Sequence, residues 1–85
     1  MQIRFSAVAL KQLKKLDKQT AIRLINFIEH KIGQLDDPRQ IGKALQGKFV
    51  KLWRYRVGDY RVIVEIQDDN FIIQVIKIGH RRDIY

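Results

Sequence analysis

Arginines in the second half of the chain carry the side chains best suited to binding an anion. They lie at two places, Arg54, Arg56 and Arg61 in the middle and Arg81 and Arg82 near the end. A guanidinium group is planar and always charged, and it binds phosphate or carboxylate through two parallel hydrogen bonds. Their concentration therefore predicts a binding site for a polyanion.

The spacing of the first three arginines predicts that they share one face of a sheet. Gly58 and Asp59 form a two-residue turn, so Arg56 should lie opposite Arg61 on the returning strand. Because side chains alternate along a strand, Arg54 should lie on the same face. The intervening residues are aromatic or β-branched: Trp53, Tyr55, Val57, Tyr60, Val62 and Val64. We therefore expect an open cationic face and an apolar face that meets the helices.

Repulsion within the cationic face has two possible remedies, and the sequence leaves both open. Like charges directly across a strand pair are destabilising, so Arg56 opposite Arg61 has a cost in the free protein. A bound anion would relieve it, and so would a carboxylate such as Glu65.

The C-terminal tail should add further chemistry to this face. It begins after Gly79, where the last predicted strand ends, so its side chains can reach the cationic face. His80 is the only nearby side chain that titrates close to neutral pH. Tyr85 offers a phenol and a ring for stacking.

The rest of the sequence predicts the elements that position these residues. In chain order these are a strand over 2–5, helices over 7–16 and 18–35, and strands over 49–57, 60–67 and 71–78. Ser6 and Asp17 are good N-caps, and the tight connection between the helices predicts a hairpin. The order β-α-α-β-β-β predicts an α+β fold, with an antiparallel sheet that carries the helical hairpin on one face. We expect the 85 residues to form a single domain, 1–85.

Composition narrows the class of partner and the compartment. The net charge of +8 favours a nucleic-acid partner, although a basic surface also serves solubility or an acidic protein partner. The absence of cysteine excludes a disulfide scaffold. No signal peptide and no long apolar run occurs, so we expect a cytoplasmic protein without a membrane segment. The paired aspartates fit turns, and we expect no metal and no cofactor.

Several segments resemble the RelE/ParE superfamily of bacterial and archaeal toxins, and more closely its RelE branch. They are LWRYRVGDYRVIVEI (52–66), IKIGHRRDIY (76–85), LDDPR (35–39) and GKAL (42–45). Together with the helical hairpin, they extend the resemblance over essentially the whole chain.

The resemblance implies a compact ribonuclease that enters the ribosomal A site and cuts mRNA there without a metal, with contacts to 16S rRNA. It also implies a cognate, RelB-like antitoxin that wraps around the toxin and blocks it. The toxin–antitoxin complex would repress its own operon, so operator DNA would be bound only through that complex.

The resemblance also implies roles for individual residues. Arg61 occupies the position of the central-strand arginine that contacts the scissile phosphate, and Arg81 that of the arginine assigned to transition-state charge. Tyr85 falls near the C-terminal tyrosine that stacks on a base or positions the sugar. Arg54 lies where RelE proteins carry a catalytic basic residue.

One position departs from the family pattern. Where RelE proteins carry another lysine two residues before Arg54, this chain has Leu52, and the adjacent Lys51 should point to the other face. Some branches use a histidine in the tail, so His80 is the best candidate for proton transfer.

Metal-free RNA cleavage attacks a phosphate with the neighbouring 2′-hydroxyl. The reaction needs a base, an acid and cations for the developing charge, and electrostatic stabilisation is often the larger contribution. The predicted catalytic residues are Arg61, Arg81, His80, Tyr85 and Arg54. The predicted RNA-binding residues are Arg56, Lys51 and Arg82.

Two other functions fit the same resemblance. A ParE-like toxin shares the fold but inhibits DNA gyrase as a binding protein without nuclease activity. A degenerate toxin would bind only its antitoxin and, with it, operator DNA. The cationic face and the tail residues favour the nuclease, because a gyrase inhibitor does not need them.

Overall fold

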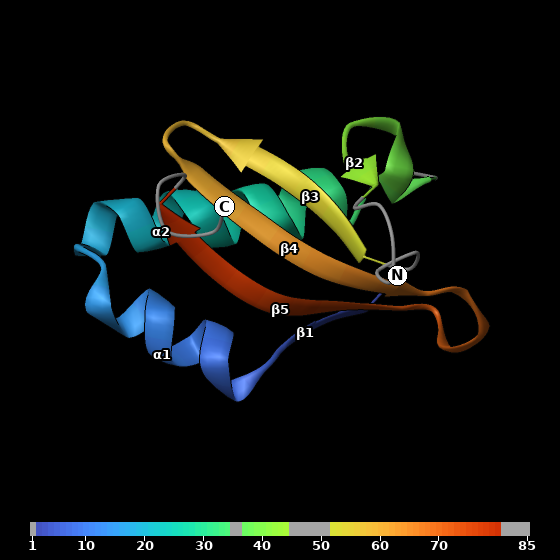
Figure 1. Ribbon diagram of the computed structural model, residues 1–85, viewed down its shortest axis with the longest axis horizontal. Coiled ribbons are helices and arrows are strands. Elements are labelled where there is room, and N and C mark those ends of the chain that lie inside the picture. Colours follow the sequence, from blue (N-terminus) through green and yellow to red (C-terminus); the bar gives the residue numbers. More distant parts are fainter. Residues whose placement is uncertain (1, 35–36, 45–51, 81–85) are drawn as a thin grey trace.

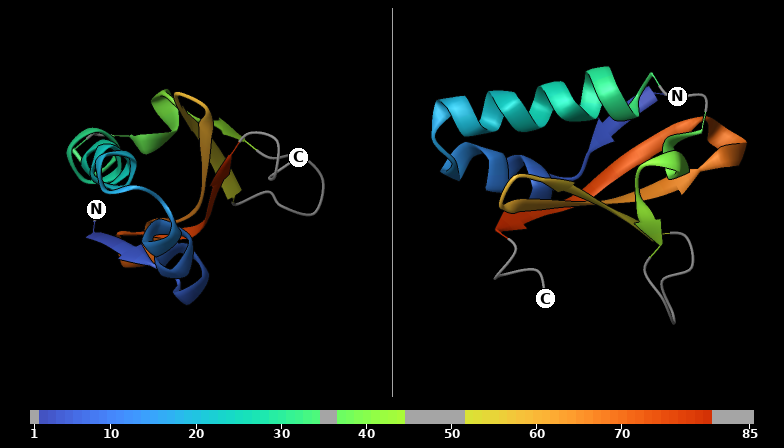
Figure 2. Two further views of the ribbon diagram at one scale, coloured as in Figure 1. Left: turned by 90° about the vertical axis from the view of Figure 1, so that its left-hand side faces the viewer. Right: turned by 90° about the horizontal axis from the view of Figure 1, so that it is seen from above.

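The chain forms a five-stranded sheet in the order β1-β5-β4-β3-β2, with its helices on one face (Figures 1 and 2). The computed structural model describes residues 2–34, 37–44 and 52–80. The strands are β1 (Gln2–Phe5), β2 (Lys43–Ala44), β3 (Leu52–Val57), β4 (Tyr60–Gln67) and β5 (Ile72–His80). The predicted α+β fold with a helical hairpin on one face of a sheet is confirmed.

Two capped helices follow β1. Helix α1 (Ala7–Lys15) begins at Ser6, whose hydroxyl accepts a hydrogen bond from Ala9 N at 3.0 Å. Helix α2 (Lys18–Asn26) begins at Asp17, whose carboxylate accepts hydrogen bonds from the Thr20 hydroxyl at 2.5 Å and from Thr20 N at 3.1 Å. The bond from the hydroxyl, followed by the bond from the amide, lowers the pKa of Asp17. A π-helical stretch, η1 (Phe27–Ile32), continues α2. Both predicted N-caps are therefore confirmed, because each side chain satisfies an amide that the first helical turn leaves open.

The core lies between the helices and the sheet. Leu24, Ile28 and Ile32 form the buried stripe of α2 and η1. They pack with apolar side chains from the sheet: Tyr55, Val57, Val62, Val64, Ile66, Ile73, Val75 and Ile78. None of the helices in the described ranges combines the length and the apolar character that crossing a membrane requires.

The β3–β4 hairpin has the predicted register. Arg56 pairs with Arg61 and Val57 with Tyr60, around a turn in which Gly58 has a φ of 59°. Glycine suits this position because a side chain disfavours the left-handed region. Sheet geometry therefore places Arg54, Arg56 and Arg61 on one face, as expected.

Three details of the sheet differ from the expectation. Strand β1 pairs with β5 in the parallel direction, so the sheet is mixed rather than wholly antiparallel. The period-two pattern of a strand is the same for both directions, which is why sequence alone could not distinguish them. A short strand, β2, forms beside β3, between the predicted helix 18–35 and the predicted strand 49–57. Strand β5 continues to His80, two residues beyond its predicted end.

Side chains of α1 and its cap continue the contacts that β1 makes with β5. Strand β1 ends at Phe5, and beyond Val75 no described strand pairs with that side of β5. Instead, the Ser6 hydroxyl donates to Ile76 O at 2.7 Å, and Ile78 N donates to Gln12 Oε1 at 2.6 Å. The exposed backbone groups of the strand thus obtain partners from a helix.

Replacing Gln12 with alanine is expected to lower the free energy of unfolding by about 1 kcal/mol, because Ile78 N–H loses its acceptor. Urea denaturation measures the change. The matched control is Lys11→Ala, on the exposed side of the same helix, which makes a similar change in helix propensity. Equal stability of the two variants would contradict the role given to Gln12.

Candidate functional site

Among the described residues, five basic side chains of β2 to β5 share the face of the sheet that points away from the helices, and Arg4 lies on the same face at the β1 edge. Paired residues of antiparallel strands lie on the same face, and the register pairs Lys43 with Arg54, Arg56 with Arg61, and Ile63 with Lys77. The pairing of Arg54 with Ile63 joins these into one set. We call Lys43, Arg54, Arg56, Arg61 and Lys77 the cationic face.

A cleft of about 170 Å³ opens within this face. Its lining, the cationic cleft, consists of Ile41, Lys43, Arg54, Arg56 and Arg61. Four of these five side chains are cationic and none is acidic. Such a concentration of guanidinium and ammonium groups favours a ligand with several negative charges, such as a phosphodiester.

Arg61 lies in the most enclosed part of the cleft. It is 7% exposed, and its Nε and Nη1 atoms are buried. The expectation that this face is open is therefore wrong for Arg61, although Arg56 is exposed and Arg54 is half-buried. Arg61 is buried because its strand, β4, lies between β3 and β5. Ile41 and Lys43, from the segment that ends at β2, also line the cleft. A charge held away from water interacts more strongly with an anion than one at the surface.

Tyr55 holds the segment that carries Ile41 and Lys43. Its hydroxyl donates to Pro38 O at 2.7 Å, within the 3-10 turn η2 (Pro38–Gln40). Gly42 packs closely against its ring, since a Cβ at that position would lie 2.9 Å from the ring. A larger residue at 42 would push the segment off β3. Tyr55 is 1% exposed, and burial raises its pKa to about 12.

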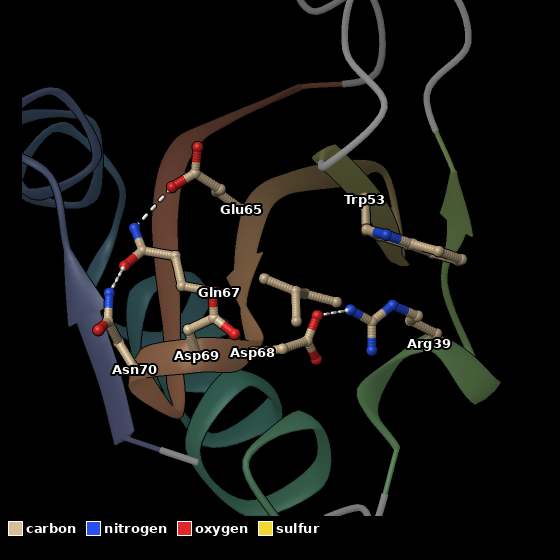
Figure 3. Close-up of a pocket in the computed structure, with 8 residues that line it drawn as sticks. Arg39, Trp53, Glu65, Gln67, Asp68, Asp69 and Asn70 are labelled. Atoms are coloured by element: carbon tan, nitrogen blue, oxygen red, sulfur yellow. Dashed lines mark hydrogen bonds and ion pairs between the residues drawn. The ribbon is translucent and has the colours of Figure 1, made fainter.

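Arg39 ties the same segment to the far end of the sheet (Figure 3). Its guanidinium lies 2.6 Å from Asp68 and 3.3 Å from Asp37, and the hydrogen bond to Asp68 raises its pKa. Its Cζ atom is 5.8 Å from the centre of the Trp53 ring. Asp68 belongs to the turn η3 (Asp68–Asn70) between β4 and β5. These contacts anchor the start of the segment that ends at β2.

Glu65 belongs to this end of the sheet and not to the cationic cleft. It lines a pocket of about 390 Å³ with Arg39, Trp53 and the η3 turn. Its carboxylate accepts a hydrogen bond from Gln67 Nε2 at 2.6 Å, as Figure 3 shows. The carboxylate proposed as an alternative neutraliser therefore lies outside the cleft that holds Arg61.

His80 does not join the cationic cleft. It pairs with Tyr60, so it lies on the face that the helices cover, and its ring meets the Tyr60 ring edge-on with centroids 5.6 Å apart. Both line a pocket of about 350 Å³ with Gln12, Lys15 and Leu16 of the α1 region. The expectation that it reaches the cationic face is wrong, because β5 continues through His80 and alternation turns it to the other side.

Comparison with known proteins decides the family. The family model described as the ParE toxin of type II toxin–antitoxin systems matches residues 3–85. The chain belongs to this family. It is a toxin of a type II toxin–antitoxin system, and its predicted membership of the RelE/ParE superfamily is confirmed.

Named relatives of this toxin carry RelE-type names. It is 29% identical over 84 residues to toxin RelG of Mycobacterium tuberculosis, covering 98% of this chain and 93% of the relative. The toxin–antitoxin complex RelBE2 of the same organism has a similar fold, with a TM-score of 0.86, 24% identity and coverage of 96% and 92%. The RelB–RelE complex of Methanococcus jannaschii matches with a TM-score of 0.74, 27% identity and coverage of 96% and 94%.

Four predicted site residues of the toxin lie outside the described ranges: Lys51, Arg81, Arg82 and Tyr85. Their roles stay predictions. Two cationic residues of the face were not among the predicted site residues. Lys77 had a usable signal, because it interrupts an apolar strand at an outward position. Lys43 had none of its own, because its place depends on the pairing of β2 with β3.

Proposed function

We propose that this toxin is a ribosome-dependent endoribonuclease that cleaves mRNA in the A site by 2′-hydroxyl attack, without a metal. The observation that carries the proposal is the cationic cleft, whose described lining has four basic side chains, no acidic one and a buried guanidinium at Arg61. The chain is also similar to proteins named toxin RelG and toxin RelE. The cleft suits a phosphodiester whose negative charge increases in the transition state.

In this proposal, charge stabilisation and positioning contribute most of the catalysis. Arg61 contacts the scissile phosphate, and Arg54 supports it from the neighbouring strand. Arg56 and Lys43 hold the backbone next to it. By resemblance, Arg81 stabilises the transition state and Tyr85 orients the nucleotide by stacking, while Lys51 and Arg82 add RNA contacts.

The position of His80 bears on the proton-transfer role predicted for it. From the helix side of the sheet it cannot share a cleft with Arg61 while β5 keeps its register. We therefore assign it no proton transfer within the described cleft. A proton-transfer role for His80 would need the end of β5 to leave the sheet.

We also propose a RelB-like antitoxin as the partner that blocks this toxin. Toxins of similar fold were solved as complexes with RelB, including those of M. tuberculosis and M. jannaschii. A net charge of +8 favours an acidic partner segment. The complex, rather than the toxin alone, would bind operator DNA.

The second candidate function is inhibition of DNA gyrase. The observation that favours it is the matching family model, which carries the ParE name. A gyrase inhibitor needs no phosphate-binding cleft, and the buried Arg61 would then be structural. The two candidates therefore predict different consequences for the same residue.

Primer extension on mRNA from translating ribosomes tests the proposal. With purified toxin added, we expect new 5′ ends within A-site codons, and no cleavage of the same mRNA without ribosomes. The matched measurement is DNA supercoiling by purified gyrase, which should be unaffected. Intact mRNA together with inhibited gyrase would contradict the nuclease and support the second candidate.

A further inference from the structure

A second cationic groove lies between the long helix and the β3–β4 turn. Its volume is about 570 Å³, and it is lined on one side by α2 and η1 and on the other by the end of β3. We call it the helix groove and define it by Arg23, Phe27, His30, Lys31, Arg56 and Val57. Three of these carry a full positive charge, and none of the lining residues that the structure describes is an aspartate or a glutamate.

The charges of the helix groove are not held by ion pairs to described carboxylates. Among the described residues, no carboxylate forms an ion pair with Arg23, Lys31 or Arg56. Arg39, by contrast, is held by two aspartates. The charge of Arg39 is therefore used within the fold, whereas the three cations of the groove can bind a ligand.

Two of the three cations are ordered by the surface beneath them. A Cβ built at Gly58 would lie 3.3 Å from Arg23 Nη2, so the guanidinium rests against the turn. The Lys31 ammonium lies 5.7 Å from the centre of the Phe27 ring. Residues 23, 27 and 31 are four apart on one helical face, which aligns them along the groove. Side chains held in this way lose less entropy when they bind an anion.

Arg56 connects the helix groove to the cationic cleft. It is exposed, and it lines both the groove and the cleft. Its neighbours along β3 and in the turn, Val57 and Gly58, complete the groove wall. The two basic surfaces are therefore continuous around the β3–β4 hairpin.

We propose that the helix groove binds the backbone of the same RNA strand that occupies the cationic cleft, at flanking nucleotides. The inference rests on the proposed function for the identity of the ligand. A single RNA strand carries one charge per nucleotide and can neutralise both surfaces in succession. An acidic protein segment would have to place carboxylates along the same row of cations. A polyglutamate peptide can represent such a segment in a binding experiment.

Binding of RNA of two lengths to the purified toxin tests the proposal. Fluorescence anisotropy would measure the affinity for a three-nucleotide and a twelve-nucleotide single strand between 0.05 and 0.5 M salt. The groove variant is Arg23→Gln/Lys31→Gln, which keeps the long side chains. The control variant is Lys11→Gln/Lys14→Gln, which removes the same charge from the exposed side of α1. A twelve-residue polyglutamate peptide serves as the acidic protein probe.

We expect the groove variant to bind the twelve-nucleotide strand about 25-fold more weakly than wild type at 0.1 M salt, since two phosphate contacts are lost. The slope of log K against log salt should fall by about 1.4. The three-nucleotide strand, which fills only the cleft, should bind both proteins equally. The control variant should change the twelve-nucleotide affinity by less than about threefold.

Several results would contradict the binding of RNA in the helix groove. These are an affinity of wild type that does not rise with RNA length, equal losses in the groove and control variants, and loss of polyglutamate binding with RNA binding unchanged. Failure of the proposed function looks different. Wild type would then leave ribosomal mRNA intact, whatever the length dependence of its RNA binding.

Discussion

Replacement of Arg61 by methionine is expected to lower mRNA cleavage on ribosomes by about 10²–10³-fold, the usual effect of removing one donor to a developing oxyanion. Methionine retains much of the length of the arginine side chain, so the packing around this 7%-exposed residue should survive. Primer extension on translating ribosomes measures the loss. Thermal unfolding followed by circular dichroism verifies that the variant is folded.

The matched control removes the same charge elsewhere. Lys14 is exposed on α1, which lies on the opposite face of the sheet, and Lys14→Met should keep cleavage within about threefold of wild type. Arg61→Lys separates charge from geometry, because lysine keeps the positive charge but lacks the planar fork that binds two phosphate oxygens. If Arg61→Met cleaved mRNA as fast as wild type, Arg61 would not be part of the catalytic site. If wild type and Arg61→Met inhibited growth equally and neither cleaved mRNA, the result would favour inhibition of DNA gyrase.

Truncation of Tyr55 to alanine is expected to lower the free energy of unfolding by about 3–5 kcal/mol. The ring is 1% exposed, contacts Phe27 edge-on at 6.5 Å and supports Gly42. A loss of this size is a large part of the stability expected for 85 residues. Urea denaturation measures it. The same change frees the segment that carries Lys43, so cleavage should fall with stability.

Tyr55→Phe isolates the hydroxyl and keeps the prediction testable if the alanine variant fails to fold. Loss of the hydrogen bond to Pro38 O should cost about 1–2 kcal/mol. The matched control is Tyr60→Phe, at a half-buried tyrosine of the neighbouring strand, which should cost less. Equal losses in the two variants would contradict the role of the Tyr55 hydroxyl.

The Tyr55 hydroxyl also makes stability depend on pH in the alkaline range. Its pKa is raised to about 12 in the folded protein, against about 10 for an unfolded tyrosine. The folded state therefore holds the proton more tightly, and this contribution is complete below pH 10. It is lost as the pH rises from about 10 to about 12. The stability advantage of wild type over Tyr55→Phe should shrink across that range.

Sequence alone determined the features that depend on local geometry. The two-residue turn at Gly58 and Asp59 and the alternation of strand residues were sufficient to place Arg54, Arg56 and Arg61 on one face. The same rule, extended two residues further along β5, would have turned His80 to the helix side. That error came from ending the strand too early rather than from the rule itself.

Tertiary structure decided everything that depends on which distant segments meet. Nothing in residues 2–5 indicates whether their strand is parallel to its neighbour, because both directions have the same side-chain period. Lys43 enters the cleft only because Tyr55, Gly42 and Arg39 hold its segment against β3. The burial of Arg61 and the continuity through Arg56 likewise depend on neighbours from several elements. Alternation determines the side of a strand on which a residue lies, and only long-range packing determines what covers it.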